Sequence, residues 1–397
     1  MRSIRMFYAV LCLPVGCLCL SVGQFSHAQT AQRERPENAS LRTAAGDTSD
    51  NPGRIDATLS PRIARKDVRR AMKKVADWEV AHSEALFTQD WTYAPLYSGL
   101  LAASATTGDP KYHDAVVRYA EKVKWQLLPG RYDHADDEAI GQAYETLYLE
   151  KKDPIRIAAL RENLDKVVVR QRDPQKDLWW WCDALYMAPS AFVTMSQITG
   201  DRKYLAFVDT EWDLTTAHLY VPADKLYFRD ATFLQKTEAN GQKLFWSRGN
   251  GWVLAGLART LSGMPKDYPH REKYVGLYRD MAERIAALQQ PSGLWRTGLL
   301  DQASYKDDEI SGSAFFTYAM AWGVNHGYLD AKKYRPVIDK SWAAMLGHVF
   351  EDGRLGSIQP IGAAPGAFGP GTSYVYGVGA FLLAGSEIDA LAKGAKQ

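Results

Sequence analysis

The sequence predicts an all-α protein in which about six helical hairpins close into a toroid, and three observations lead to this prediction. Apolar residues follow a helical period from residue 60 onward. A turn motif recurs between an apolar segment and a more polar one. Long loops rich in glycine and tryptophan separate these repeats, and in a toroid they would gather at one mouth.

The first 28 residues are typical of a signal peptide. Arg2 and Arg5 give a basic start, residues 6–22 are apolar, and Ser26-His27-Ala28 resembles a cleavage site. A lipoprotein site at Cys17 is an alternative, although the apolar run continues past it. The segment predicts an exported protein, periplasmic or secreted.

Residues 29–60 are polar and contain two prolines, which is typical of a disordered leader. We therefore expect one folded domain over residues 61–397. Beyond the signal the chain keeps a single cysteine, Cys182. An internal disulfide and a thiolate metal site are thus both excluded from the mature protein.

The composition is that of a globular protein, with 46% hydrophobic residues and a net charge of +2. This charge argues against nucleic acid or an anionic membrane as the main partner. No later apolar run approaches the roughly 20 residues that span a bilayer, so we expect no membrane segment in the domain. The 12 tryptophans and 21 tyrosines suit a helical core and also a cleft that stacks on sugar rings.

The domain is expected to start with a helix after Ser60-Pro61, because Val68, Met72, Val75 and Trp78 follow at helical spacing. Residues 184–198 and 252–261 are more uniformly apolar and indicate buried helices.

The repeated turn reads Thr-Gly-Asp-Pro-Lys-Tyr at residues 107–112 and Thr-Gly-Asp-Arg-Lys-Tyr at residues 199–204. Weaker copies occur near residues 264–274 and 327–334. The glycine suits a left-handed helix end, and the aspartate suits the first position of the next helix. The repeats fit an open solenoid or a closed toroid, and the long loops between them favour the toroid.

One candidate catalytic residue is Asp183, which follows three tryptophans and precedes an apolar helix. The residue could simply cap that helix. Alternatively, a carboxyl among indole rings is poorly solvated, so its pKa rises and it can deliver a proton near neutral pH. Spacing alone does not decide between these interpretations.

A second carboxyl could come from Asp136, Asp137 or Glu138. These residues are adjacent in the sequence, so their negative charges repel one another. A solvated acidic turn is the simpler explanation of this cluster.

A third segment places Arg248 between Trp246 and Trp252 among glycines. Such an arginine could grip a carboxylate or could stack on tryptophan for structural reasons. The histidines lack metal-ligand spacing, and the motifs of metalloproteases, nucleotide-binding loops and serine hydrolases are absent.

Two motifs together resemble glycoside hydrolase family 105, the unsaturated rhamnogalacturonyl and related unsaturated glucuronyl hydrolases. They are Trp-Cys-Asp-Ala at residues 181–184, followed by Met-Ala-Pro, and Trp-Ser-Arg-Gly-Asn-Gly-Trp at residues 246–252. The resemblance covers about residues 65–390. It implies an (α/α)6 barrel. It also implies removal of a 4,5-unsaturated uronic acid from the non-reducing end of oligosaccharides made by lyases, through hydration of the C4–C5 double bond.

The same resemblance suggests residue roles. Asp183 matches the family's general acid and base, and Asp137 is the best match for a second aspartate, with Asp136 next. The residues expected to contact substrate are Trp181, Trp246, Arg248, Trp252 and Tyr93. Some family members have histidines in two stretches where this chain has none, and Arg229 is expected to replace one of them.

Two other classes of function remain open from the sequence. The toroid could carry an ordinary inverting glycosidase or a polysaccharide lyase, or it could bind glycans without catalysis. Hydration needs only a proton donor and water, so the expected partner is an oligosaccharide and no cofactor or metal is implied. The sequence identifies neither the polysaccharide nor the oligomeric state.

Overall fold

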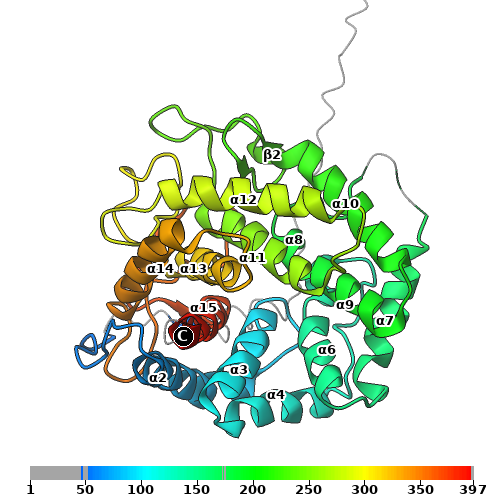
Figure 1. Ribbon diagram of the computed structural model, residues 1–397, viewed down its shortest axis with the longest axis horizontal. Helices are drawn as coiled ribbons and strands as arrows, with labels where there is room; N and C mark the ends of the chain where they lie inside the picture. The colour runs from blue at the N-terminus through cyan, green and yellow to red at the C-terminus, as the bar shows by residue number, and fades with distance from the viewer. Residues whose placement is uncertain (1–45, 48–51, 172, 174–175, 395–397) are drawn as a thin grey trace, which may run out of the picture. The chain divides into compact units, whose positions relative to one another are not determined.

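The computed structural model describes residues 46–47, 52–171, 173 and 176–394, and the long helices form two concentric rings (Figure 1). The inner ring comprises α3 (Ala94–Thr107), α6 (Gly141–Glu150), α9 (Pro189–Thr199), α11 (Ser247–Gly263), α13 (Ile310–Asn325) and α15 (Val375–Gly394). The outer ring comprises α2 (Arg65–Ser83), α4 (Pro110–Lys122), α7 (Ile155–Val168), α10 (Lys203–Leu219), α12 (Arg271–Ala287) and α14 (Ala331–Leu346).

The inner ring is closed, because its helices contact one another all the way round. These contacts run from α3 through α6, α9, α11 and α13 to α15, and α15 packs in turn against α3. An open solenoid would leave its first and last repeats apart. The described chain is therefore the expected all-α toroid of six helical hairpins, an (α/α)6 barrel.

The inner helices are apolar around most of their surface because other helices surround them. In α13, every residue from Ile310 to Gly323 is buried. Helix α15 is long and apolar enough to span a membrane, but most of it is buried inside the barrel. Our expectation that no later apolar run reaches this length was therefore wrong, because a core helix with neighbours on all sides has the same composition.

The recurring turn has the predicted geometry. Gly108 and Gly200 end inner helices with φ of 78° and 75°, in the left-handed region that favours glycine. The Asp201 carboxylate then accepts a hydrogen bond from the backbone N–H of Lys203 at 2.9 Å, and Asp109 plays the same part in α4. Each motif thus ends an inner helix and starts the next outer one.

The remaining elements are short. Two one-turn helices, α5 (Ala135–Glu138) and α8 (Ala184–Met187), precede inner helices. Strand β1 (Gly46–Asp47) pairs antiparallel with β4 (Ser373–Tyr374), and β2 (Tyr220–Val221) pairs antiparallel with β3 (Leu226–Tyr227). Two 3-10 turns, η1 (Glu84–Leu86) and η2 (Ala231–Phe233), complete the list.

The first helix and the folded domain both begin at residues that differ from the prediction. The first helix begins at Arg65 rather than after Pro61, and the chain before it is already held in place. Ile55 forms a β-bridge with Phe350, and the backbone N–H of Asp56 donates to the carbonyl of Val349. The folded domain therefore includes the end of the predicted leader. The predicted signal peptide, Cys17 and residues 29–45 lie outside the described residues.

The predicted helix over residues 184–198 is two helices. Helix α8 ends at Met187, and α9 starts at Pro189. Proline has no N–H for the helical ladder, so it favours the first turn of a new helix over the interior of an old one. The break leaves Asp183 on a short helix of its own, which is held separately from α9.

The contact that closes the ring depends on two glycines. A Cβ atom on Gly379 of α15 would lie 2.3 Å from the carbonyl oxygen of Pro95 in α3, and one on Gly99 would lie 2.6 Å from the carbonyl oxygen of Gly379. We expect Gly379→Ala to lower the free energy of unfolding by about 2–3 kcal/mol, because the backbones must separate. The control is Gly276→Ala in α12, where nothing lies within 4 Å of the new Cβ. It should be neutral or stabilising by up to about 1 kcal/mol. Equal stability of the two variants in urea unfolding would contradict this account of ring closure.

Candidate active site

The predicted catalytic residues lie where inner helices begin. Asp136 is in α5, just before α6, and Asp183 immediately precedes α8. Arg248 is in the first turn of α11. Inner helices of the barrel run in the same direction, so these starts gather at one end of it.

The carboxyl of Asp183 does not cap its helix. Asp183 occupies the capping position of α8, yet its side chain accepts no hydrogen bond from the backbone of that helix. The capping interpretation of this residue therefore fails. Only 8% of the residue is exposed, and burial raises the pKa of its carboxyl, against the opposing charge of Arg229.

Two neighbours contact this carboxyl directly. The Nε atom of Arg229 lies 3.5 Å from Oδ2 of Asp183, and Sγ of Cys182 lies 3.6 Å from the same oxygen. Both Asp183 and Arg229 keep a little accessible surface, with side-chain exposures of 11% and 18%. A ligand can therefore reach the pair, while bulk solvent screens it little.

The segment that carries Arg229 is tied to the segment that carries Asp183. The backbone N–H of Cys182 donates to the carbonyl of Arg229 at 2.8 Å, and Trp181 forms a β-bridge with Asp230. Arg229 also donates to the carboxylate of Asp230 at 2.6 Å. These bonds fix the guanidinium beside the carboxyl of Asp183.

The two adjacent aspartates of the acidic cluster have different environments. Arg131 donates to both oxygens of Asp137, with two bonds of 2.7 Å. Among the described residues Asp136 has no such bidentate partner; Nδ1 of His134 lies 3.7 Å from its Oδ2 and accepts a hydrogen bond from its backbone N–H. The two adjacent aspartates therefore differ in their contacts with arginine.

The electrostatics support this distinction. Burial raises the pKa of Asp136 to about 8; Arg131 opposes the rise, and the charges of Asp137, Asp90 and Asp183 add to it. The charge of Asp183 makes the smallest of these contributions to the pKa of Asp136. Asp136 lies in α5 and Asp183 immediately precedes α8, and these two short helices contact each other.

Arg248 has a structural environment. It is 1% exposed, and its guanidinium donates to the backbone carbonyls of Gln359 and Pro360, both at 2.8 Å. It also lies over the rings of Trp246 and Tyr376. With these partners it holds the loop after residue 358 in place, and its positive charge opposes the rise in the pKa of Asp183.

Three of the residues that were expected to contact substrate are buried. Tyr93 and Trp252 have no exposed surface, and they pack in the core against Phe87 and Phe315 respectively. Both were predicted as ligand contacts because aromatics at a helix start occur in binding sites and in cores alike. Trp246 is 1% exposed, and its Nε1 donates to the side-chain oxygen of Gln359, so it helps to hold the loop that contains Gln359.

The structure adds one aromatic residue, Trp180, that was not among the expected substrate contacts. Trp180 is 40% exposed, and its ring lies 5.3 Å from the guanidinium of Arg229. Trp181 is nearly buried between Trp180 and His134, with ring centroids 4.8 Å from each. Of the three consecutive tryptophans, Trp180 is therefore the one whose ring is exposed enough to stack on a sugar ring. A run of three tryptophans signals such a surface without showing which ring carries it.

The described residues contain no group of three or more histidine, cysteine, aspartate or glutamate side chains placed to hold a metal ion.

The sequence model of glycosyl hydrolase family 88 matches residues 63–392, which is almost the whole of the barrel. The chain belongs to glycosyl hydrolase family 88. A curated relative from Formosa agariphila, an unsaturated 3S-rhamnoglycuronyl hydrolase, is 40% identical over 82% of this chain and 91% of its own length. The family and this relative confirm that the chain is a glycoside hydrolase.

Solved structures agree with membership of family 88. A family 88 hydrolase from Bacteroides vulgatus is 31% identical, with a TM-score of 0.78 over 82% of this chain and 98% of that one. A protein described as a polysaccharide lyase is also 31% identical, with a TM-score of 0.77 over 84% and 98%. A family 105 hydrolase from C. acetobutylicum shares the fold at 20% identity, with a TM-score of 0.68 over 80% and 98%. The resemblance to family 105 is thereby confirmed at the level of the shared barrel, beside the direct match to family 88.

Proposed function

We propose that this family 88 hydrolase removes a 4,5-unsaturated uronyl residue from the non-reducing end of an oligosaccharide in which that residue is joined to rhamnose. The name of the Formosa agariphila relative supports the choice of sugars. The observation that carries the proposal is the carboxyl of Asp183, which is buried, unused as a helix cap, and fixed beside Arg229.

In the proposed reaction, Asp183 gives its proton to C4 of the unsaturated ring. The O–H bond breaks, the electrons of the C4–C5 double bond form the new C4–H bond, and positive charge develops at C5 and the ring oxygen. The carboxylate left on Asp183 then stabilises this charge, because it lies in a site of low polarity.

Water completes the addition. It attacks C5 and returns a proton to Asp183, so the acid is regenerated in each turnover. The product at C5 is a hemiketal, which opens to a ketone, and the glycosidic bond breaks as the ring rearranges. The reaction consumes one water and needs no oxidant or reductant.

Asp136 is proposed as the second carboxyl of the reaction, in the role for which Asp137 was the first expectation. Because its pKa is about 8, the pair formed with Asp183 retains a proton at neutral pH. A retained proton is what an acid needs in order to protonate carbon at that pH. Asp137 serves instead to anchor Arg131 beside the pair.

The test uses oligosaccharides produced by lyases, followed by the ultraviolet absorbance of the conjugated double bond. Hydration consumes the double bond, so the absorbance should fall as the unsaturated sugar disappears. A polysaccharide lyase is the second candidate, because one solved relative is described as such. A lyase would create double bonds from an intact polysaccharide, and a rise in absorbance would overturn the proposal.

Arg229 is expected to bind the uronate carboxylate or a neighbouring hydroxyl, in place of a histidine that some relatives carry. Arg229→Ala should raise KM by roughly tenfold or more, because a charge-assisted contact to substrate is lost. Arg229→Lys should recover only part of this effect, since lysine lacks the planar pair of donors. Steady-state kinetics on the unsaturated substrate measure both. An unchanged KM in Arg229→Ala would show that the guanidinium does not touch substrate.

We also propose that the enzyme acts outside the cytoplasm. The N-terminal 28 residues support this, through their basic start, apolar stretch and cleavage-like end. Products of polysaccharide lyases would reach an exported enzyme directly. N-terminal sequencing of the protein from its host's periplasm and medium tests the proposal, and an intact Met1 in a cytoplasmic fraction would contradict it.

A further inference from the structure

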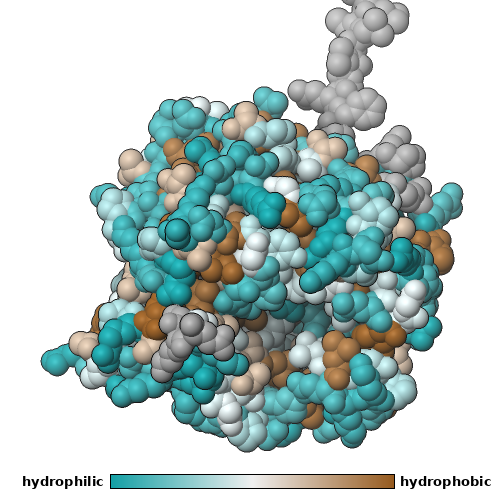
Figure 2. Space-filling model, viewed as in Figure 1, coloured by the Kyte–Doolittle hydropathy of each residue, from teal (hydrophilic) through white to brown (hydrophobic). Residues whose placement is uncertain are grey.

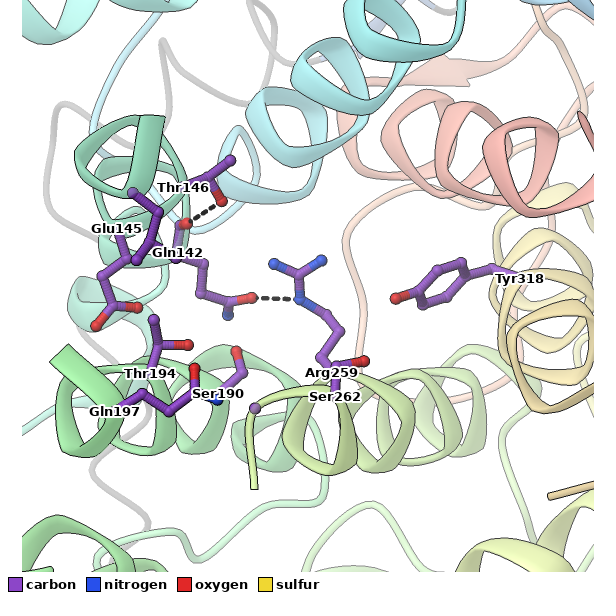
Figure 3. A pocket seen from close by; sticks show the side chains of 11 residues that line it. Gln142, Glu145, Thr146, Ser190, Thr194, Gln197, Arg259, Ser262 and Tyr318 are labelled. Atoms are coloured by element: carbon purple, nitrogen blue, oxygen red, sulfur yellow. Dashed lines mark hydrogen bonds between the residues drawn. The ribbon is translucent and has the colours of Figure 1, made fainter. Parts of the chain in front are cut away.

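A second polar cavity lies in the inner ring, away from the catalytic carboxyls. Its volume is about 220 Å³, and α6, α9, α11 and α13 line it (Figure 3). Its polar lining includes Gln142, Glu145, Ser190, Thr194, Arg259 and Tyr318. In Figure 3, the side chains of Gln142 and Tyr318 approach Arg259 from opposite sides. The face seen in Figure 2 is hollowed near its centre, where the inner helices end.

The cavity is distinct from the candidate active site. Arg259 lies eleven residues after Arg248 on the same helix, which places it about 16 Å farther along the axis. Contacts between α6 and α8 lie between the cavity and the candidate active site. Gln142 donates to the carbonyls of Tyr186 and Met187 at 2.9 and 2.8 Å, and so joins α6 to the helix that follows Asp183.

Arg259 brings an unneutralised positive charge to this cavity. Its Nε donates to the side-chain oxygen of Gln142 at 2.6 Å, and a terminal nitrogen lies 3.5 Å from the hydroxyl of Ser98. Within the described part of the chain, it makes no salt bridge with a carboxylate. Glu145 is the acid that shares the cavity; burial raises the pKa of its carboxyl well above the usual range, against the opposing charge of Arg259.

Two lining side chains have polar atoms with no partner among the described residues. These are Oε1 of Glu145, in a residue 2% exposed, and the hydroxyl of Ser190, in a residue 6% exposed. Buried polar atoms in folded proteins are almost always hydrogen-bonded. Their position on a cavity wall, beside a charged arginine, means that a guest in the cavity would supply the missing partners.

We propose that this cavity is a second binding site, for a small hydroxylated carboxylate of the size of a sugar acid. The guanidinium of Arg259 matches the carboxylate. The hydroxyls of Ser190, Thr194 and Tyr318 and the unpartnered Oε1 of Glu145 match hydroxyl groups, which both donate and accept hydrogen bonds. A cavity of about 220 Å³ is smaller than the roughly 300–1,000 Å³ of sites for drug-sized ligands, so it suits a single sugar unit.

The test is calorimetric titration of the full-length protein with sodium glucuronate as the probe. We expect saturable binding to wild type, weakened about tenfold in Arg259→Gln and several-fold in Thr194→Val. Arg229→Gln removes the proposed uronate contact at the catalytic end, so the glucuronate binding that persists in this variant should belong to the cavity and should weaken when Arg259→Gln is added. Binding lost in Arg229→Gln and kept in both cavity variants would place the ligand in the active site and overturn the proposal, as would absence of binding to wild type.

Two competing ligands check the proposed chemistry. Glucose lacks the carboxylate, and sulfate lacks the hydroxyls, so both should bind more weakly than glucuronate. Equal binding of glucose would overturn the role of Arg259, and equal binding of sulfate would indicate a site for any anion. If Arg259→Gln does not fold, because its bond to Gln142 is lost, Thr194→Val and Ser190→Ala carry the test. Unaltered affinity in both would contradict the site.

Discussion

Asp183→Asn should reduce kcat on an unsaturated oligosaccharide by about a thousandfold while leaving substrate affinity within a few-fold of wild type. General acid catalysis by a positioned side chain contributes roughly a hundredfold to ten-thousandfold, and here the same carboxyl also takes a proton back from water. Asparagine keeps the size and most polar contacts of aspartate but has no acidic proton. Loss of ultraviolet absorbance measures kcat, and calorimetry with the same substrate measures affinity.

A matched control comes from the repeated turn. Asp201 lies two residues before α10, and its carboxylate accepts a hydrogen bond from the backbone N–H of Lys203, the first residue of that helix, whereas Asp183 makes no such bond to α8. Asp201→Asn keeps a capping oxygen and should leave kcat unchanged. If Asp183→Asn retains activity within about tenfold of wild type, another group supplies the proton. If neither variant nor wild type turns over any unsaturated oligosaccharide yet all bind it equally, the protein is a glycan-binding protein.

The fold was predictable because its rules are local. Glycines 108 and 200 end helices in a conformation that other residues rarely adopt, and the aspartates after them start new helices. Repetition of that signal along an apolar pattern is enough to predict helical hairpins. Closure of the ring was less evident, because it depends on contacts between α3 and α15 at opposite ends of the domain.

The roles of individual site residues were less predictable, because they depend on which atoms meet across the barrel. Asp136 and Asp137 are adjacent in sequence, and only the bidentate pairing of Asp137 with Arg131 separates them. Likewise, an arginine between two tryptophans can bind ligand or brace a loop. For Arg248 the carbonyls of Gln359 and Pro360, more than 100 residues away, decide in favour of bracing.

Asp136→Asn should separate the catalytic role of this carboxyl from its cost to stability. In the folded chain its pKa is about 8, against an ordinary value of 3.8. Between these values the folded chain keeps a proton that the unfolded chain has lost, so the free energy of unfolding falls as the pH rises. Asparagine removes this penalty. The variant should therefore be more stable than wild type above pH 8, by about 2–4 kcal/mol, and equally stable near pH 4.

Activity should change in the opposite direction. Without Asp136, kcat should drop about a hundredfold. The alkaline limb of kcat/KM that titration of Asp136 would give near pH 8 in wild type should be absent from the variant, because asparagine does not titrate. Asp137→Asn is the matched comparison at the next residue. It breaks the pair with Arg131, so it should lower stability by about 1–3 kcal/mol at pH 7 and reduce kcat less than Asp136→Asn does. If Asp137→Asn is inactive and Asp136→Asn is fully active, the second catalytic role belongs to Asp137. The carboxyl whose pKa lowers stability at high pH would then not be the carboxyl that turnover requires.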